Sequence, residues 1–173
     1  MDAAKLLKHM AWANQEILGL VSESPDEALD AYSVNPEWTV REIARHIASS
    51  ATWYGYRLLD RSNFTESQNQ EWQAKLEESE TPPATMKEMK VILDRLKAAD
   101  AELLNAATLP EGVVIREFEG KTITRARSTV ISQAIHHATE HRAQLVSALE
   151  AKGFTKINLD DFDLWAYSTT IGE

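Results

Sequence analysis

Apolar residues recur every three or four positions in four stretches of the chain, the spacing that is typical of amphipathic α-helices. In the first stretch, for example, Leu6, Met10 and Ile17 would share one face. The four stretches are Ala3–Val21, Thr39–Leu59, the residues between Thr85 and Pro110, and Arg127–Lys152. Helices with one apolar face bury it against each other, so the pattern predicts an all-α helical bundle.

The ends of three predicted helices carry residues that favour helix initiation or termination. Thr39 precedes Glu42 by three positions, and Thr85 precedes Glu88 by the same interval, so each pair predicts a capping box. Gly153 follows the last predicted helix and can adopt the left-handed conformation that ends many helices. These signals define the expected boundaries of the second, third and fourth helices.

Three segments lie outside the predicted helices. Arg61–Thr81 is polar and weakly periodic, which predicts a loop that includes a short helix around Trp72. Val113–Thr124 holds two short β-prone runs on either side of Glu119 and Gly120, which predicts a small hairpin that rests on the bundle. In the C-terminal sequence INLDDFDLWAYSTT, we expect the aromatic residues to pack back on the bundle.

Length and composition narrow the class of protein. The chain has 173 residues, enough for one domain with a hydrophobic core, and 43% of them are hydrophobic. It contains no cysteine, which excludes disulfides, thiolate metal sites and cysteine nucleophiles. Its net charge of −9 would repel a phosphate backbone, so we expect no nucleic-acid partner. With no signal-peptide pattern and no apolar run that could span a membrane, we expect a cytoplasmic protein without a membrane partner.

Histidines provide the main chemical signal. Of the five in the chain, His136, His137 and His141 lie within six positions of the last predicted helix. Residues four apart on an α-helix differ by about 40° in azimuth and about 6 Å along the axis, so His137 and His141 project from one face and can bind one ion. His136 points elsewhere. The segment reads HATEH, without glutamate after its first histidine, which excludes the zinc-protease motif HExxH.

A metal site needs a third ligand, because histidine pairs at this spacing also occur in helices that bind no metal. His46 on the second predicted helix is the best candidate, since it shares a face with Ile43 and Ser50 at the edge of the core. The alternative is a core histidine held by hydrogen bonds, the more common situation for a lone histidine on one helix. His9 has no partner at ligand spacing and is predicted to be structural.

At these histidines the chain resembles the DinB/YfiT-like superfamily of metal-dependent four-helix-bundle proteins. The matching segments are KHMAWANQEIL, WTVREIARHIASSATWY, AIHHATEHRAQLVSALEAKG and LDDFDLWAY, in that order along nearly the whole chain. The resemblance implies a four-helix bundle in one domain over residues 1–173, with His46, His137 and His141 as the metal ligands. Ala143 is a departure, because the family often has glycine after the arginine that follows its last histidine. The three ligands are unaffected by it.

The resemblance also implies a divalent metal ion, zinc or nickel, since three imidazoles suit either ion and leave a coordination position open. Because the superfamily includes bacillithiol S-transferases and mycothiol-dependent isomerases, we expect a metal-dependent transferase. Its partner would be a small-molecule substrate such as a low-molecular-weight thiol. Two alternatives stay open: a hydrolase that uses metal-bound water, and a non-catalytic metal-binding stress-response module whose helices form a homodimer.

Overall fold

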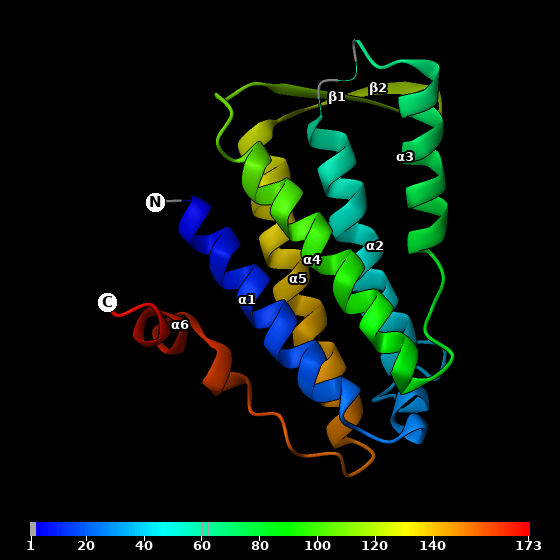
Figure 1. Ribbon diagram of the computed structural model, residues 1–173, viewed down its shortest axis with the longest axis vertical. Coiled ribbons are helices and arrows are strands. Elements are labelled where there is room, and N and C mark those ends of the chain that lie inside the picture. The colour runs from blue at the N-terminus through cyan, green and yellow to red at the C-terminus, as the bar shows by residue number, and fades with distance from the viewer. Residues whose placement is uncertain (1–2, 60, 62) are drawn as a thin grey trace.

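Four long helices pack side by side as a bundle (Figure 1), and the computed structural model describes residues 3–59, 61 and 63–173. Within the bundle, α1 and α2 each pack against both α4 and α5. The bounds are α1 Ala3–Ser22, α2 Val40–Leu58, α4 Met89–Ala106 and α5 Arg127–Glu150. The predicted all-α four-helix bundle is therefore confirmed.

The bundle is held together by the apolar faces that the sequence pattern indicates. On α1, Met10 and Ile17 are fully buried, whereas Leu6 lies at the edge of the core. Burying one such side chain stabilises the fold by about 1.5–3 kcal/mol relative to leaving it exposed. The large buried side chains of α2 and α4 are Ile43, Ile47, Leu58, Met89, Ile92, Leu96 and Leu103. Within the described residues, no helix combines the length and apolarity needed to cross a membrane.

The predicted capping box at the start of α2 does not form. Thr39 is the N-cap residue, but its side chain makes no capping hydrogen bond. Glu42, which should complete the box, instead accepts a hydrogen bond from Arg45. The predicted start of the helix is nevertheless right, because the first turn is closed by the backbone hydrogen bond from Ile43 to Thr39 and Val40 is buried.

The capping box predicted from Thr85 and Glu88 is wrong for a similar reason. Glu88 accepts a hydrogen bond from the backbone N–H four residues earlier, and the Thr85 side chain makes no cap. The backbone N–H of Met86 donates to the carboxylate of Asp26, which lies 60 positions earlier in the chain. Two short 3-10 helices occupy these places, η1 Asp26–Asp30 and η2 Met86–Glu88.

The largest departure from the prediction is α3 (Glu66–Ser79), a helix of 14 residues in the segment predicted as a loop with a short helix. It begins with a complete capping box, in which Thr65 and Gln68 each accept a hydrogen bond from the other's backbone N–H. The helix lies outside the bundle against α2 (Figure 1). Its apolar periodicity in the sequence is weak, and Leu76 is the one apolar residue that this helix buries. Ser62, in the predicted loop, lies outside the described residues.

The predicted hairpin is present, with strands β1 (Val113–Phe118) and β2 (Lys121–Ala126) paired antiparallel. Glu119 and Gly120 connect them with φ angles of 51° and 72°, the positive values that a two-residue type I′ turn requires. The hairpin lies across one end of the bundle, where β1 contacts α2 and β2 contacts α5 (Figure 1). These contacts support a two-stranded unit that would be marginally stable alone.

The segment after α5 packs back on the bundle, as predicted, and contacts α1, but not all of its aromatic residues are buried. The backbone at Gly153 has the predicted left-handed conformation, with φ 85°. Tyr167 is buried, with its ring centroid 5.4 Å from that of Trp12. Trp165 is 82% exposed, so the prediction is wrong for this residue. The segment contains η3 Leu159–Phe162 and α6 Leu164–Thr170.

Candidate metal centre

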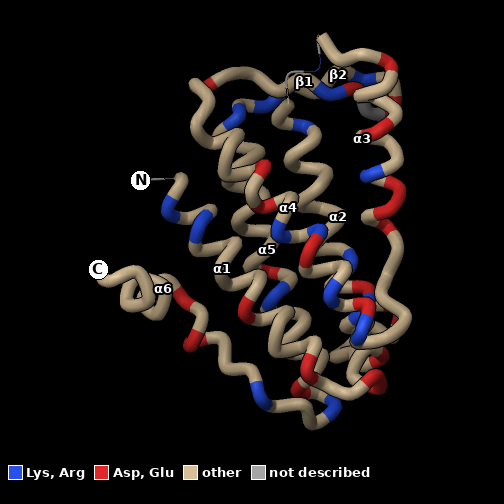
Figure 2. The backbone as a smooth tube through the Cα atoms, in the orientation of Figure 1, with Lys and Arg blue, Asp and Glu red and all other residues tan. Residues whose placement is uncertain are grey.

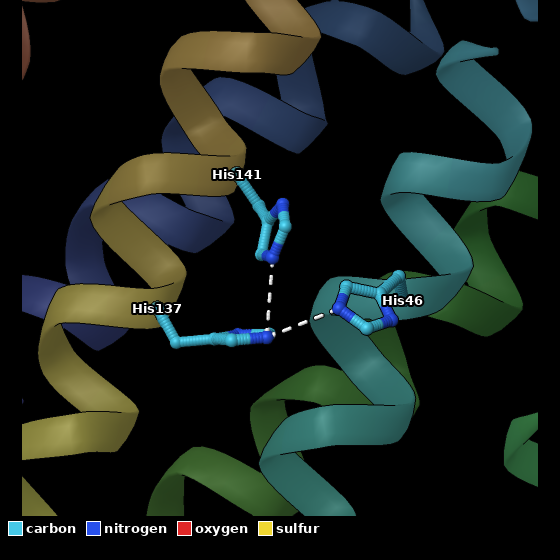
Figure 3. Close-up of side chains that lie close together, drawn as sticks. All are labelled: His46, His137 and His141. Atoms are coloured by element: carbon cyan, nitrogen blue, oxygen red, sulfur yellow. Dashed lines mark hydrogen bonds between the residues drawn. The ribbon is translucent and has the colours of Figure 1, made fainter. Parts of the chain in front are cut away.

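Three histidine side chains from two facing helices meet between α2 and α5 (Figure 3). His137 and His141 project from α5, and His46 projects from α2. The Nε2 atom of His137 lies 3.0 Å from Nε2 of His46 and 3.1 Å from Nε2 of His141. One ring nitrogen of each residue lies within 4.8 Å of the other two. The structure thus brings together the three residues that the sequence suggests as ligands.

Ring nitrogens that face one another in this way favour a cation between them. A neutral imidazole nitrogen either donates or accepts a hydrogen bond, so Nε2 of His137 cannot serve both neighbours equally well. A divalent ion would accept all three lone pairs. Zinc–nitrogen distances of about 2.0–2.1 Å place two ligands of a tetrahedral ion about 3.3 Å apart. The observed separations of 3.0 and 3.1 Å are close to this value, so the residues fit a metal ion after small side-chain rotations.

Burial keeps two of the imidazoles neutral, which is the protonation state that binds a metal. The pKa of His137 is lowered to about 4, first by burial and then by positive charge on His141 and His46. The pKa of His46 is lowered by burial, then by positive charge on His141 and Arg45, and Glu80 opposes the shift. Protons therefore compete weakly for these two nitrogens at neutral pH.

Gln144 holds the third imidazole in a metal-binding orientation. Its Oε1 atom lies 2.8 Å from Nε1 of Trp38 and 2.8 Å from Nδ1 of His141. An indole N–H can only donate, so the amide oxygen must face Trp38, and Nδ1 of His141 must then carry the proton that it donates to the same oxygen. This leaves the lone pair of His141 on Nε2, the atom that faces His137.

The sequence pattern does not identify Gln144 or Trp38 as a partner of His141, although one signal is present. A side chain three residues after a histidine on a helix can reach its ring, and Gln144 follows His141 by three. No local pattern points to Trp38, which lies 106 positions from Gln144 and reaches it only because α2 packs on α5.

Aromatic rings surround the three histidines. The ring centroid of Trp38 lies 5.1 Å from that of His46 and 5.6 Å from that of His141, both in edge-on geometry. The ring of Tyr54, two turns after His46 on α2, is edge-on to His137 at 5.6 Å. These apolar rings lower the local dielectric constant, which strengthens electrostatic interactions at the centre.

The other two histidines lie outside this cluster. Nε2 of His9 lies 2.8 Å from the backbone carbonyl oxygen of Phe162, so His9 ties α1 to the C-terminal segment. This agrees with its predicted structural role. His136 is exposed on α5 and does not belong to the group of convergent nitrogens.

A buried polar network that the sequence pattern does not predict lies beside the centre. Arg142, next to His141, donates from Nη1 to Oδ1 of Asn14 at 2.6 Å, and Nδ2 of Asn14 donates to Oδ2 of Asp100 at 3.0 Å. Burial raises the pKa of Asp100 to about 7 and lowers that of Arg142 to about 10. The network joins α1, α4 and α5 and so helps to hold the helix that carries two of the three histidines.

A comparison with known protein families matches the DinB family over residues 1–170. No curated protein and no solved structure matches the chain. The family match covers the four bundle helices and all three clustered histidines, and it agrees with the resemblance seen in the sequence motifs. The chain therefore belongs to the DinB family.

Proposed function

We propose that this chain is a metal-dependent enzyme that transfers a small thiol to an electrophile, with His46, His137 and His141 as ligands of one divalent ion. The proposal is carried by one observation, the convergence of three Nε2 atoms from two helices. The lowered pKa values of His46 and His137, and the proton that Gln144 holds on Nδ1 of His141, support it because they favour free lone pairs at the centre.

Three protein ligands suit a catalytic site better than a structural one, because structural zinc sites use four. An ion held there would lower the pKa of a thiol that binds it and so supply the nucleophile that a chain without cysteine lacks. His46 and His137 would stay neutral during the reaction because burial opposes their protonation. Zinc and nickel are the ions that we propose, since both bind imidazole nitrogen well.

Two other functions use the same ligands. A hydrolase would have water in place of the thiol, and its turnover would not depend on added thiol. A non-catalytic module, with its helices in a homodimer, would be expected to close the site with a fourth protein ligand. Within the described part of the chain the convergent group has three members, which favours an enzyme.

Metal analysis of the purified protein, together with a thiol assay, tests the proposal. We expect about one divalent ion per chain, and loss of both the ion and thiol transfer in His137→Ala, because two imidazoles bind an exchangeable ion too weakly. The assay offers the metal-loaded protein a panel of cellular thiols and a chromogenic electrophile. The matched control is His136→Ala, which removes an exposed imidazole from the same helix.

Circular dichroism of each variant shows whether the helices survive. Turnover that is equal with and without metal would contradict the transferase. Inertness towards every thiol, with the ion bound, would instead favour the hydrolase or the non-catalytic module.

A further inference from the structure

Two adjoining hollows lie where the hairpin meets α2 and α5. Their volumes are about 250 Å³ and 680 Å³, and Tyr54, Arg57 and Arg116 line both of them. The smaller hollow also reaches Thr129 and Gln133 on α5. We call the two together the hairpin groove.

The inner end of the hairpin groove adjoins the metal centre. Tyr54, which lines both hollows, is in edge-on contact with the ring of His137. Ser50 lines the larger hollow and lies one helical turn after His46 on α2. The groove therefore lies next to the three histidines, with Tyr54 in contact with both.

The groove is positively charged although the chain has a net charge of −9. Arg57, Arg61, Arg116 and Arg125 line its two hollows, and among the lining residues that the structure describes Glu117 is the one carboxylate. Figure 2 shows basic residues on the hairpin and at the adjacent end of α2, whereas acidic residues are prominent on α3 and at the opposite end of the bundle. A small anion would thus be attracted to this groove in particular.

The hairpin register holds two of these arginines towards the bundle. Val114 pairs with Arg125 and Arg116 pairs with Ile123, and the side chains of paired residues emerge on the same face of a sheet. All four residues line the smaller hollow, and Val114 is buried. The face of the hairpin that rests on the bundle therefore carries two guanidinium groups.

On the opposite wall, Arg57 is in a position that an anion would stabilise. Its guanidinium lies 5.9 Å from the ring centroid of Trp53 and 5.7 Å from that of Tyr54, and it makes no ion pair within the described residues. Its pKa is lowered by burial and then by the positive charge of Arg116. An oxyanion bound between Arg57 and Arg116 would compensate both the burial of the Arg57 charge and its repulsion by Arg116. The planar guanidinium can donate two hydrogen bonds to such an anion.

The dimensions of the groove indicate the shape of its ligand. Arg57 follows His46 by eleven residues of the same helix, a rise of about 16 Å. A ligand that reaches both must be elongated, with its charge at one end. A nucleic acid fits poorly, because most of the surrounding surface of this acidic chain would repel its backbone.

We propose that the hairpin groove binds the oxyanion end, a carboxylate or phosphate group, of an elongated small-molecule substrate whose reactive group lies at the three histidines. This inference rests on the enzymatic function proposed above. It assigns the hairpin to substrate recognition and the histidines to chemistry. It also identifies the substrate class as a small organic anion.

Nuclear magnetic resonance titration of the metal-loaded full chain tests the inference. The probes are succinate, inorganic phosphate and, as the matched uncharged molecule, succinamide. We expect succinate or phosphate to shift the signals of Arg57, Arg116 and Trp53 with a Kd on the order of 1 mM, as befits a small fragment. The tighter of the two identifies the oxyanion, and succinamide should leave the signals unchanged.

Arginine variants show whether oxyanion binding depends on the groove itself or only on the overall charge of the protein. Arg57→Gln and Arg116→Gln should each weaken oxyanion binding by about 10–100-fold, because a charged hydrogen bond is lost, while metal content and circular dichroism stay the same. The control is Lys156→Gln, which removes the same charge from an exposed residue beyond the C-terminal end of α5, whereas the groove lies near the N-terminal end of that helix. Equal binding of succinamide, or equal weakening in the Lys156 variant, would overturn the inference.

The result also distinguishes this inference from the proposed function. Oxyanion binding that depends on the arginines, together with no thiol turnover, would support the groove and contradict the transferase. Thiol turnover with no oxyanion binding would overturn the groove and leave the transferase supported.

Discussion

Replacing the buried Asp100 with asparagine should make the stability of the protein less dependent on pH. Asp100 is 3% exposed on α4, and Oδ1 of its carboxylate is buried without a hydrogen-bond partner among the described residues. Oδ2 accepts a hydrogen bond from Asn14, which lies between Asp100 and Arg142. The substituted amide keeps an oxygen for Asn14 but cannot ionise.

The size of the effect follows from the pKa of Asp100, which burial raises from 3.8 to about 7. Between these two pH values the unfolded chain releases the proton while the folded chain keeps it, so the free energy of unfolding falls as the pH rises. The full loss is about 4 kcal/mol, and more than half of it falls between pH 5 and pH 8. Below pH 3.8 this stabilising contribution is fully present, and above pH 7 it is lost.

Urea unfolding followed by circular dichroism at pH 5, 6, 7 and 8 measures this difference. The stability of Asp100→Asn relative to the wild type should rise by about 3 kcal/mol from pH 5 to pH 8. Asp94→Asn, an exposed site on the same helix, is the matched control and should follow the wild-type profile.

Parallel profiles for the wild type and Asp100→Asn would refute the reasoning. A loss of stability at pH 8 in the variant would show that attraction to Arg142 outweighs the burial of the charge. In that case the network would act as a buried ion pair bridged by Asn14, and breaking it would be destabilising.

Two further predictions concern the metal centre. Gln144→Ala should weaken metal binding by about 10–100-fold, because His141 loses the acceptor that orients its ring. Competition with a chromophoric chelator measures the metal affinity, and an unchanged affinity would contradict the role of Gln144. His9→Ala and His136→Ala should leave the metal content unchanged, because His9 contacts a backbone carbonyl and His136 is exposed. Metal analysis of both variants checks this, and loss of the ion in either variant would show that a ligand is misassigned.

Features that depend on neighbours in the sequence could be predicted from the sequence. The bundle helices follow from apolar residues three and four positions apart, and the His137–His141 pair follows from the same helical geometry. The hairpin follows from β-prone runs around Glu119 and Gly120, which adopt the positive φ angles of its turn.

Local sequence patterns fail to predict the helix caps, because a side chain at a capping position can form its hydrogen bond with other partners instead. Glu42 and Glu88 both have the spacing of a capping box, yet each forms a hydrogen bond elsewhere. Thr65 and Gln68 form a complete box at the start of α3, in a segment whose apolar pattern is too weak to predict a long helix. Propensity is a weak guide where the helix buries little surface.

The sequence alone determined the four bundle helices and which two histidines share a face, since both depend on the geometry of one helix. Only the tertiary structure decided that His46 meets that pair, that Trp38 and Gln144 orient His141, and that arginines from the hairpin and α2 line one groove. These contacts join residues far apart in the chain, so they depend on how α2 packs against α5 and on where the hairpin rests. Residue spacing along one element carries no information about that packing.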